Sequence, residues 1–405
     1  MLQNTVGIVS EFNPFHYGHQ FLIRKTREKY GEDTGIVCVM SGDFVQRGEA
    51  ACFSKYARAE SACLEGADLV LELPVPWCCS SAESFAAGAV SILHGLGGIS
   101  AVSFGSECGD ADRIRQAAEA LLSPEMEEAL QHQLRHNKNY ASARQAALAA
   151  VSGDLAELLN EPNNILAVEY AKAILRKNAP MDLFTVSRTG ASHDSYADGT
   201  VRSAKEIREI LGKDPAADAW KNHVPEHAAG VYQREIRQGC GPVDTESIEQ
   251  AILSRLRLLS SEEIMNLPET DGGVGELFHR SIQTTGSLQE LLMSVKHKNI
   301  ALSRVRRLVL AAALGISREM AGGEPEYIRV LSFNERGRMI LHHAEPALPL
   351  LTKTAHLQRE DGPGRELFEL GSRAHDLYVL GFRDPGQWVC GEDWRKGPVI
   401  VEPEI

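Results

Sequence analysis

Short apolar runs alternate with helix-like stretches along the first 110 residues. The runs are rich in β-branched residues and lie at residues 6–9, 36–40, 68–73 and 101–104. Runs that are almost continuously apolar are typical of strands buried on both faces of a parallel sheet. The helix-like stretches between them fit the crossovers that parallel strands require. The pattern therefore predicts an α/β fold.

The pattern changes after residue 110. Residues 110–180 are rich in Ala, Leu, Glu, Gln and Arg and poor in β-branched residues, which predicts a helical insertion. A strand follows at residues 183–186. After it, residues 203–211 form a helical pattern in which Ser203 stands at the N-cap position. Residues 1–215 are therefore predicted to form one domain.

The second half of the chain is predicted to be mainly helical. Residues 246–259 and 302–316 have helical periodicity, and the four residues from Ser260 form a capping box. From about residue 326 the pattern mixes turns with strand-like runs at residues 328–331 and 377–380. The predicted divisions are 216–325 for a helical domain and 326–405 for a mixed C-terminal region.

Composition and charge narrow the classes of function. The chain has 405 residues, 43% of them hydrophobic, and 42 basic against 55 acidic residues give a net charge of −13. This charge argues against nonspecific nucleic-acid binding, although a local basic stripe can still contact RNA. No apolar stretch approaches the roughly 18 residues of a membrane helix. The eight scattered cysteines indicate reduced thiols, so we expect a cytoplasmic protein without a membrane partner.

The sequence FNPFHYGHQ, residues 12–20, follows the first predicted strand and opens the next helix. A helix N-terminus at the carboxyl edge of a parallel sheet favours phosphate. Gly18 would let the backbone approach a ligand, and His16 and His19 could both donate to a departing pyrophosphate. A metal site is disfavoured because no third ligand lies nearby, and histidines on a metal-binding helix are usually four apart. A capped turn without chemistry remains an alternative.

This motif resembles the HxGH signature of the HIGH-type nucleotidyltransferase superfamily. Further blocks resemble the bacterial tRNA(Met) cytidine acetate ligase family: MSGDFVQRGEAACFSKYARAESACLEGADLVLELP at 40–74, FGSE at 104–107, EPNNILAVEYAKAIL at 161–175 and RSAKEIR at 202–208. The resemblance implies a Rossmann-like nucleotidyltransferase domain at 1–215 and a tRNA-binding role for 216–325. It also implies that ATP activates acetate as acetyl-adenylate. The acetyl group then passes to the wobble cytidine of elongator tRNA(Met), giving N4-acetylcytidine.

The resemblance also implies roles for individual residues. His16 and His19 match the catalytic histidines. Mg²⁺ is expected to accompany ATP, and no separate protein metal site is expected. The block RSAKEIR departs from the superfamily pattern because Lys205 stands where a threonine is usual, which puts a hydroxyl contact with phosphate in doubt. The expected ATP contacts are Gly7, Ile8, Val9, Ser10, Glu11, Phe12, Asn13, Pro14, Phe15, His16, Tyr17, Gly18, His19, Gln20, Gly105, Asn163, Asn164, Arg188 and Ser203.

Several side chains beyond the expected ATP contacts are candidates for substrate contacts. Arg47 and Lys55 follow the second predicted strand and could steer acetate, triphosphate or the anticodon, and Asp43 could hold a metal-bound water. Phe53 or Tyr56 could stack on an anticodon base. The densest basic cluster is a weaker candidate for tRNA, because a solvated helix face is the usual explanation for such a cluster. It consists of Lys296, Lys298, Arg304, Arg306 and Arg307.

Two other functions stay open at this point. One is a small-molecule adenylyltransferase or cytidylyltransferase, which would release pyrophosphate without acetate or tRNA. The other is a noncatalytic nucleotide-sensing RNA-binding protein. In that case substitution of either motif histidine would leave acetylcytidine unchanged.

Overall fold

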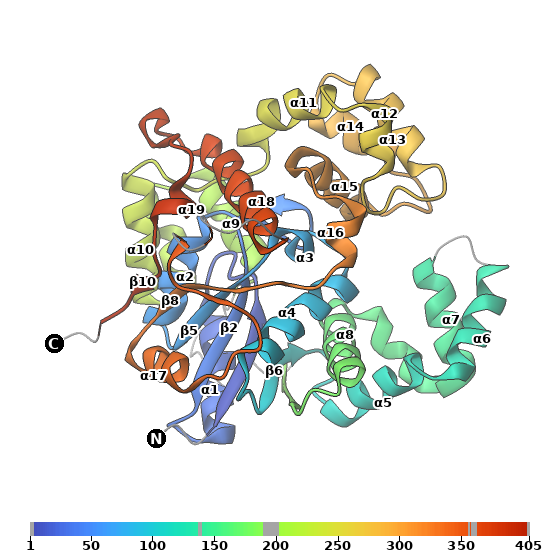
Figure 1. Ribbon diagram of the computed structural model, residues 1–405, viewed down its shortest axis with the longest axis horizontal. Helices are drawn as coiled ribbons and strands as arrows, with labels where there is room; N and C mark the ends of the chain where they lie inside the picture. The colour runs from blue at the N-terminus through green and yellow to red at the C-terminus, as the bar shows by residue number, and fades with distance from the viewer. Residues whose placement is uncertain (1–3, 137–139, 189–201, 355–356, 358–362, 403–405) are drawn as a thin grey trace.

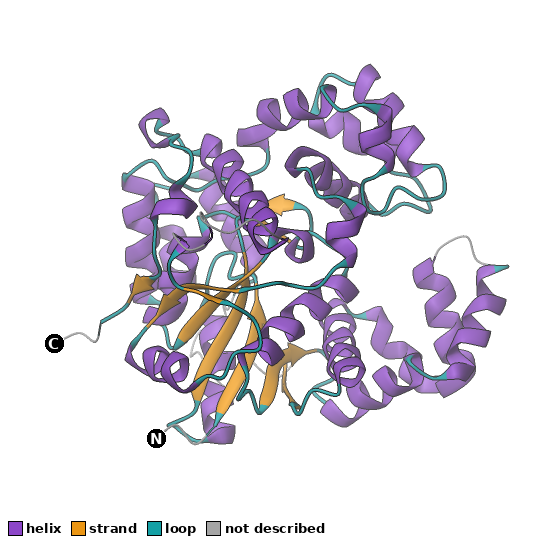
Figure 2. Cartoon of the chain, in the orientation of Figure 1, coloured by secondary structure: helices purple, strands orange, loops and turns teal. Residues whose placement is uncertain are grey.

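The computed structural model describes residues 4–136, 140–188, 202–354, 357 and 363–402. Its centre is a mainly parallel sheet in the order β10-β8-β5-β2-β1-β6-β7, with β9 beside β8 (Figure 2). Only β8 runs antiparallel to its neighbour β5. The strands are β1 (Thr5–Ser10), β2 (Gly35–Ser41), β5 (Leu69–Leu73), β6 (Ala101–Ser106), β7 (Asp182–Ser187), β8 (Ile328–Phe333), β9 (Leu350–Leu351) and β10 (Val399–Ile400); β3 (Phe44–Val45) and β4 (Glu49–Ala50) form a separate pair.

Helices cover both faces of the sheet, as the apolar runs predict. Every residue of β2 is buried, and its alternate side chains enter two different cores: Val37 and Val39 lie in one, Ile36 and Cys38 in the other. The first core includes side chains of α3 (Val75–Cys78), α4 (Ala82–Leu96), α5 (Ala111–Leu121) and α8 (Pro162–Lys177); the second includes side chains of α1 (Tyr17–Tyr30), α2 (Lys55–Leu64), α9 (Ala204–Lys213) and α10 (Glu226–Arg237).

The strand order reverses at the carboxyl ends of β1 and β6. From β1 the chain adds β2 and then β5 on one side, and later adds β6 and β7 on the other side. At such a reversal the crossover helices leave toward opposite faces, so the strand ends between them stay accessible to a ligand. The turn that contains His16 and His19 begins at this point.

Two helical segments extend beyond the sheet. The pair α6 and α7 projects from the sheet at the right of Figure 1. Helices α11–α15 form a separate group toward the upper right. The bounds are α6 (Pro124–Leu134), α7 (Tyr140–Ser152), α11 (Glu249–Arg257), α12 (Ser261–Met265), α13 (Val274–Thr284), α14 (Leu288–Val295), α15 (Leu302–Leu314) and α16 (Arg318–Gly322). No helix in the described ranges is long and apolar enough to cross a bilayer.

The C-terminal region contributes strands to the central sheet. Its strand β8 pairs with β5, and β10 pairs with β8. The predicted strand at 377–380 is wrong, because α18 (Pro363–Tyr378) continues into the 3-10 helix Val379–Gly381. A short apolar run fits either structure, and here Tyr378 packs edge-on against Phe44 as part of a helix. The remaining helices are α17 (Glu335–His343) and α19 (Glu392–Arg395).

Candidate active site

The turn between β1 and α1 brings the two motif histidines together. His16 is the N-cap of α1, and its Nδ1 accepts a hydrogen bond of 2.9 Å from the amide of Gly18. The amide of His16 donates in turn to Nδ1 of His19 at 3.2 Å. A Cβ atom at Gly18 would lie 2.8 Å from Cε1 of His16, so glycine at this position makes room for the imidazole. The motif is therefore a capping box built from two histidines.

These bonds determine where the imidazole protons lie. Because both Nδ1 atoms accept hydrogen bonds, each neutral ring carries its proton on Nε2. The two rings are stacked with centroids 3.9 Å apart and planes inclined by 21°. Two Nε2–H donors therefore lie side by side at the N-terminus of α1, where the positive end of the helix dipole also favours negative charge.

The surroundings keep both histidines neutral. Burial and, secondarily, the charge of Arg188 lower the pKa of His16 to about 4, and Arg208 adds to the effect. Burial and the neighbouring His16 hold the pKa of His19 well below its ordinary value. The positive charge of the site thus comes from the arginines, while the imidazoles provide directed hydrogen bonds.

Gly105 and Arg188 lie at the carboxyl ends of β6 and β7, on the side of β1 away from β2. Gly105 is in β6, and the amide of Arg188, just after β7, donates to the carbonyl of Ser106 at 2.9 Å. A Cβ atom at Gly105 would lie 3.3 Å from Cγ of Arg188, so the arginine side chain passes over the glycine. Since the side chain of Arg188 is exposed and acts electrostatically on both histidines, it can reach an anion bound beside them.

Asn13 and two arginines hold the loops that surround the turn. Asn13 Oδ1 accepts from the amide of Cys52 at 2.8 Å, and its carbonyl accepts from Arg208 at 2.7 Å. Its Nδ2 is buried without a hydrogen-bond partner among the described residues, which leaves both N–H donors of this amide group for a ligand. Arg58 is fully buried and donates to the carbonyls of Phe53, Glu11, Ser41 and Gly42.

The sequence analysis did not identify Arg58. It lies in the helical stretch KYARAES, where an arginine between alanines is typical of a solvated helix face. Nothing in this local sequence indicates that its guanidinium points inward and donates hydrogen bonds at the ends of β1 and β2. A contact of this kind depends on the tertiary arrangement of the loops.

Asn163 and Asn164 have different positions at the N-terminus of α8. Asn164 is buried, and its Oδ1 accepts from the amides of Glu107 and Cys108 at 3.0 and 3.1 Å. Glu107 returns the interaction, because its carboxylate accepts from the amide of Asn164 at 2.9 Å and from the side chain of Asn163. Asn164 therefore fixes the loop after Gly105, whereas Asn163 is only partly buried.

Ser203 caps α9 in a capping box with Glu206, and both side chains are exposed. Lys205 is 73% exposed and lies 3.8 Å from Glu209. The structure thus places this helix start at the surface, and only Arg208, one turn further along, contacts the histidine turn through Asn13. Residues 189–201, which precede it, lie outside the described residues.

The other candidate ATP contacts are near the turn but differ in what is available to a ligand. Gly7, Ile8 and Val9 lie within β1, where backbone groups pair with β2 or β6. A Cβ atom at Gly7 would come within 2.6 Å of Leu93, so this glycine allows α4 to pack on the sheet. Ser10, Glu11, Tyr17 and Gln20 are partly exposed, whereas Phe12, Pro14 and Phe15 are buried.

The structure corrects the interpretation of Asp43 and Lys55 as ligand contacts. Lys55 is 1% exposed and lies 2.9 Å from Glu72 and 2.6 Å from Asp393. Asp43 accepts from the amide of Lys55 at 2.7 Å and from His375 at 2.8 Å, so both of its oxygens are engaged. These groups form a buried ionic cluster, completed by Arg329, that joins the C-terminal segment to the sheet.

Phe53 and Tyr56 are buried too. Phe53 stacks on Tyr232 with centroids 4.4 Å apart, and the Tyr56 hydroxyl donates to Asp393 at 2.8 Å. Neither ring can therefore receive an unstacked base without a rearrangement of the core.

Among the described residues, no group of three or more His, Cys, Asp or Glu side chains is arranged to hold a metal ion.

Interactions within the protein engage the three arginines of the basic cluster but leave its two lysines exposed. Arg307 donates to both carboxylate oxygens of Glu269 at 2.9 Å, and Arg304 donates to the carbonyl of the same residue. Arg306 pairs with Glu49 of the β3–β4 hairpin. Lys296 and Lys298 are exposed, so they are the members of the cluster best placed to meet an external phosphate.

A parallel sheet whose first strand leads into a paired-histidine helix start defines the chain as a nucleotidyltransferase of the HIGH class. Residues 3–388 match the family described as HIGH Nucleotidyl Transferase. More narrowly, the chain belongs to the tRNA(Met) cytidine acetate ligase family. A relative of that name from Caldanaerobacter subterraneus subsp. tengcongensis is 35% identical over 393 residues, 94% of this chain and 96% of the relative.

Other comparisons agree over nearly the whole chain. A tRNA(Met) cytidine acetate ligase from Syntrophomonas wolfei is 34% identical over 97% of this chain and 99% of its own length. The crystal structure of Thermotoga maritima TmcAL bound with alpha-thio ATP superimposes with a TM-score of 0.90 at 30% identity, covering 99% of this chain and 100% of that chain. The predicted family and fold class are confirmed.

Proposed function

We propose that this protein is an ATP-dependent ligase that acetylates the wobble cytidine of elongator tRNA(Met). A carboxylate oxygen of acetate attacks the α-phosphorus of ATP, and pyrophosphate leaves with the electron pair of the broken P–O bond. The exocyclic N4 amine of cytidine then attacks the acetyl carbonyl, loses a proton and displaces AMP. The products are N4-acetylcytidine, AMP and pyrophosphate. The names of the family relatives and an ATP analogue bound to a structural neighbour support this reaction.

The observation that carries the proposal is the pair of Nε2–H donors on His16 and His19. Charge accumulates on the β- and γ-phosphates as pyrophosphate leaves, and donors already fixed in position stabilise it without reorganisation. The neutral state of both rings matters because each Nδ1 must keep accepting its backbone amide. Arg188, which follows β7, adds a positive charge that acts on His16.

The remaining proposed contacts surround the nucleotide. The side-chain amide of Asn13, whose Nδ2 has no partner among the described residues, would donate to the phosphates. Gly105 is the proposed adenosine contact at the end of β6, where the side chain of Arg188 now covers it. Ser203 would act from the start of α9. Mg²⁺ is proposed as the counterion of the triphosphate, because Mg²⁺ in sites of this kind takes most of its ligands from phosphate and water. ATP and tRNA are substrates present in the cytoplasm, so we place the reaction there.

The test is to incubate the purified protein with ATP, labelled acetate and tRNA, digest the RNA and identify labelled nucleosides. We expect N4-acetylcytidine that depends on both acetate and ATP. Pyrophosphate release with a phosphorylated metabolite, independent of acetate and tRNA, would instead indicate an adenylyltransferase or cytidylyltransferase. ATP binding without any turnover would indicate a nucleotide-sensing protein.

A further inference from the structure

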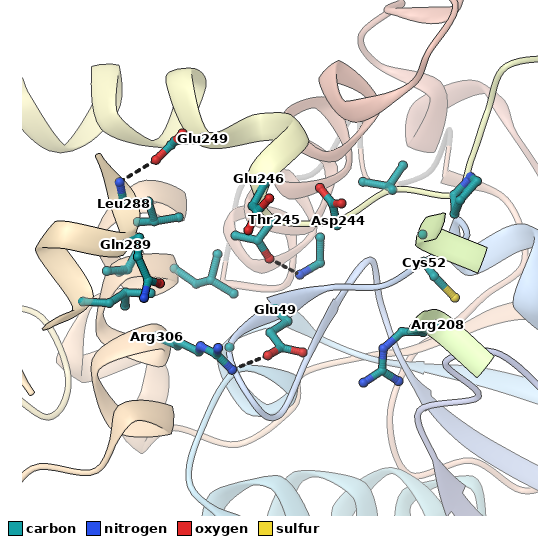
Figure 3. A pocket seen from close by; sticks show the side chains of 18 of the residues that line it. Glu49, Cys52, Arg208, Asp244, Thr245, Glu246, Glu249, Leu288, Gln289 and Arg306 are labelled. Carbon is teal, nitrogen blue, oxygen red and sulfur yellow. Dashed lines mark hydrogen bonds and ion pairs between the residues drawn. The ribbon is translucent and has the colours of Figure 1, made fainter. Parts of the chain in front are cut away.

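A cavity lies between the nucleotidyltransferase domain and the helical segment. None of the proposed ATP contacts lines it. Its volume is about 550 Å³. The β3–β4 hairpin and α9 form one wall, and the segment at 242–249 with α14 and α15 forms the other (Figure 3). A volume of this size is within the range of about 300–1,000 Å³ that is usual for small-molecule sites.

The cavity shares residues with the wall of the histidine turn. Arg208 lines it while donating to the carbonyl of Asn13, and it also acts electrostatically on His16. Cys52 lines it as well, and the amide of Cys52 donates to the side chain of Asn13. One asparagine therefore separates the cavity from the site where the adenylate would form.

The lining holds four carboxylates and three arginines, Arg383 among them, and this small excess of negative charge favours an uncharged polar ring over a phosphate. Carboxylates of Asp244, Glu246 and Glu249 line the side formed by the segment at 242–249. Glu49 pairs with Arg306 within the cavity. Carboxylates repel phosphate but accept hydrogen bonds from ribose hydroxyls and base amines. The apolar part consists of Leu211, Val243, Leu292, Val309 and Leu310, against which the face of a base can pack.

We infer that this cavity receives the acceptor nucleoside of the RNA, unstacked from its neighbours, with the reacting amine directed toward Arg208 and the histidine turn. The inference rests on the proposed function. Enzymes that modify a base outside a duplex commonly hold it in a pocket of their own. The helical segment then has a defined role, because its α14 and α15 supply the side of the pocket that the sheet lacks.

The fold offers a matched pair of glycines for a test. Gly212 in α9 lines the cavity, and a Cβ atom built on it meets no heavy atom within 4 Å. Gly230 in α10 is also exposed and equally open, but does not line the cavity. Both are helical glycines that other residues can replace without strain. Gly212→Phe would fill the cavity, and Gly230→Phe is its control.

Two rates are measured for each variant: acetate-dependent exchange of pyrophosphate into ATP without tRNA, and acetylation of tRNA at limiting tRNA. For Gly212→Phe we expect kcat/KM for tRNA to fall at least about tenfold, a loss of one decade in transition-state affinity. The rate of acetate-dependent pyrophosphate exchange without tRNA should stay within about twofold of the wild-type rate. Gly230→Phe should retain both rates. Glu246→Gln, which removes one charge without filling space, should raise the KM for tRNA and leave exchange intact.

The outcomes separate the two proposals. If the wild-type protein makes no acetylcytidine, the proposed function fails and the inference falls with it. If the wild type is active and Gly212→Phe acetylates tRNA with unchanged kcat/KM, the inference alone is overturned. Loss of exchange together with acetylation in folded Gly212→Phe would also overturn it, because the cavity would then serve ATP or acetate. Thermal unfolding of each variant establishes that it is folded.

Discussion

His375 Nδ1 lies 2.8 Å from Asp43 Oδ2, which joins α18 to the loop after β2 across 332 residues of sequence. The other ring nitrogen lies 2.8 Å from Glu392. Burial alone would lower the pKa of His375, but the two carboxylates outweigh it and raise the pKa to about 10. Burial raises and His375 lowers the pKa of Asp43, with a net result of about 2. Both groups are therefore charged at neutral pH.

We predict that His375→Leu destabilises the protein by about 3–5 kcal/mol, the usual result of removing one member of a buried ion pair. The histidine contribution is complete below its ordinary pKa of 6.5 and is lost as the pH rises through about 10. The aspartate contribution is complete above 3.8 and is lost as the pH falls toward about 2. The difference in the free energy of unfolding between wild type and His375→Leu should therefore be greatest between pH 3.8 and pH 6.5. Urea unfolding measured across the pH range tests this.

Lys396→Gln is the control for this substitution. Lys396 pairs with Glu392 at 2.7 Å, but its side chain is 40% exposed, and exposed pairs contribute about 0–1 kcal/mol. An equally small effect of His375→Leu would show that the buried cluster does not hold the C-terminal segment to the sheet.

A second prediction separates the two roles of His16. His16→Asn should keep the cap of α1, because the asparagine oxygen can take the place of Nδ1 and asparagine is among the preferred N-cap residues. It removes the Nε2–H donor, so acetate-dependent pyrophosphate exchange should fall by about 10²–10³-fold, the usual cost of one transition-state donor. Unfolding measurements should show little change. Near-normal exchange would mean that the imidazole has only a capping role.

The sequence predicted the central strands and the histidine turn because local signals determine both. Residues 36–40 are apolar throughout and became the fully buried β2, and the pair His16 and His19 stands at a strand-to-helix junction. Lys55 shows where such signals end. A lysine after a serine cap is usually solvated, and its burial is explained by the carboxylates of Glu72 and of the distant Asp393. Contacts of this kind depend on segments hundreds of residues apart.

A third prediction concerns the two asparagines at the start of α8. Asn164→Ala would leave the partly buried amides of Glu107 and Cys108 without their acceptor, at a cost of at most about 1–3 kcal/mol for each unpaired group. The loop after Gly105 should then shift, and the KM for ATP should rise by about tenfold or more as near-attack geometry is lost. Asn163→Ala removes only a bond to Glu107 and serves as the control. A larger effect from Asn163→Ala would assign the nucleotide contact to that residue.

The last prediction tests the basic cluster of the helical segment. If Lys296 and Lys298 meet RNA phosphates, the double substitution to glutamate should weaken tRNA binding and reduce the slope of log Kd against log salt by about 1–2, since each lost phosphate contact contributes about 0.7–0.9. Arg307→Gln should change the slope little, because that guanidinium already pairs with Glu269. Binding is measured by filter retention at several salt concentrations. A slope change confined to Arg307→Gln would place the RNA on α15, with its intramolecular ion pair opened on binding.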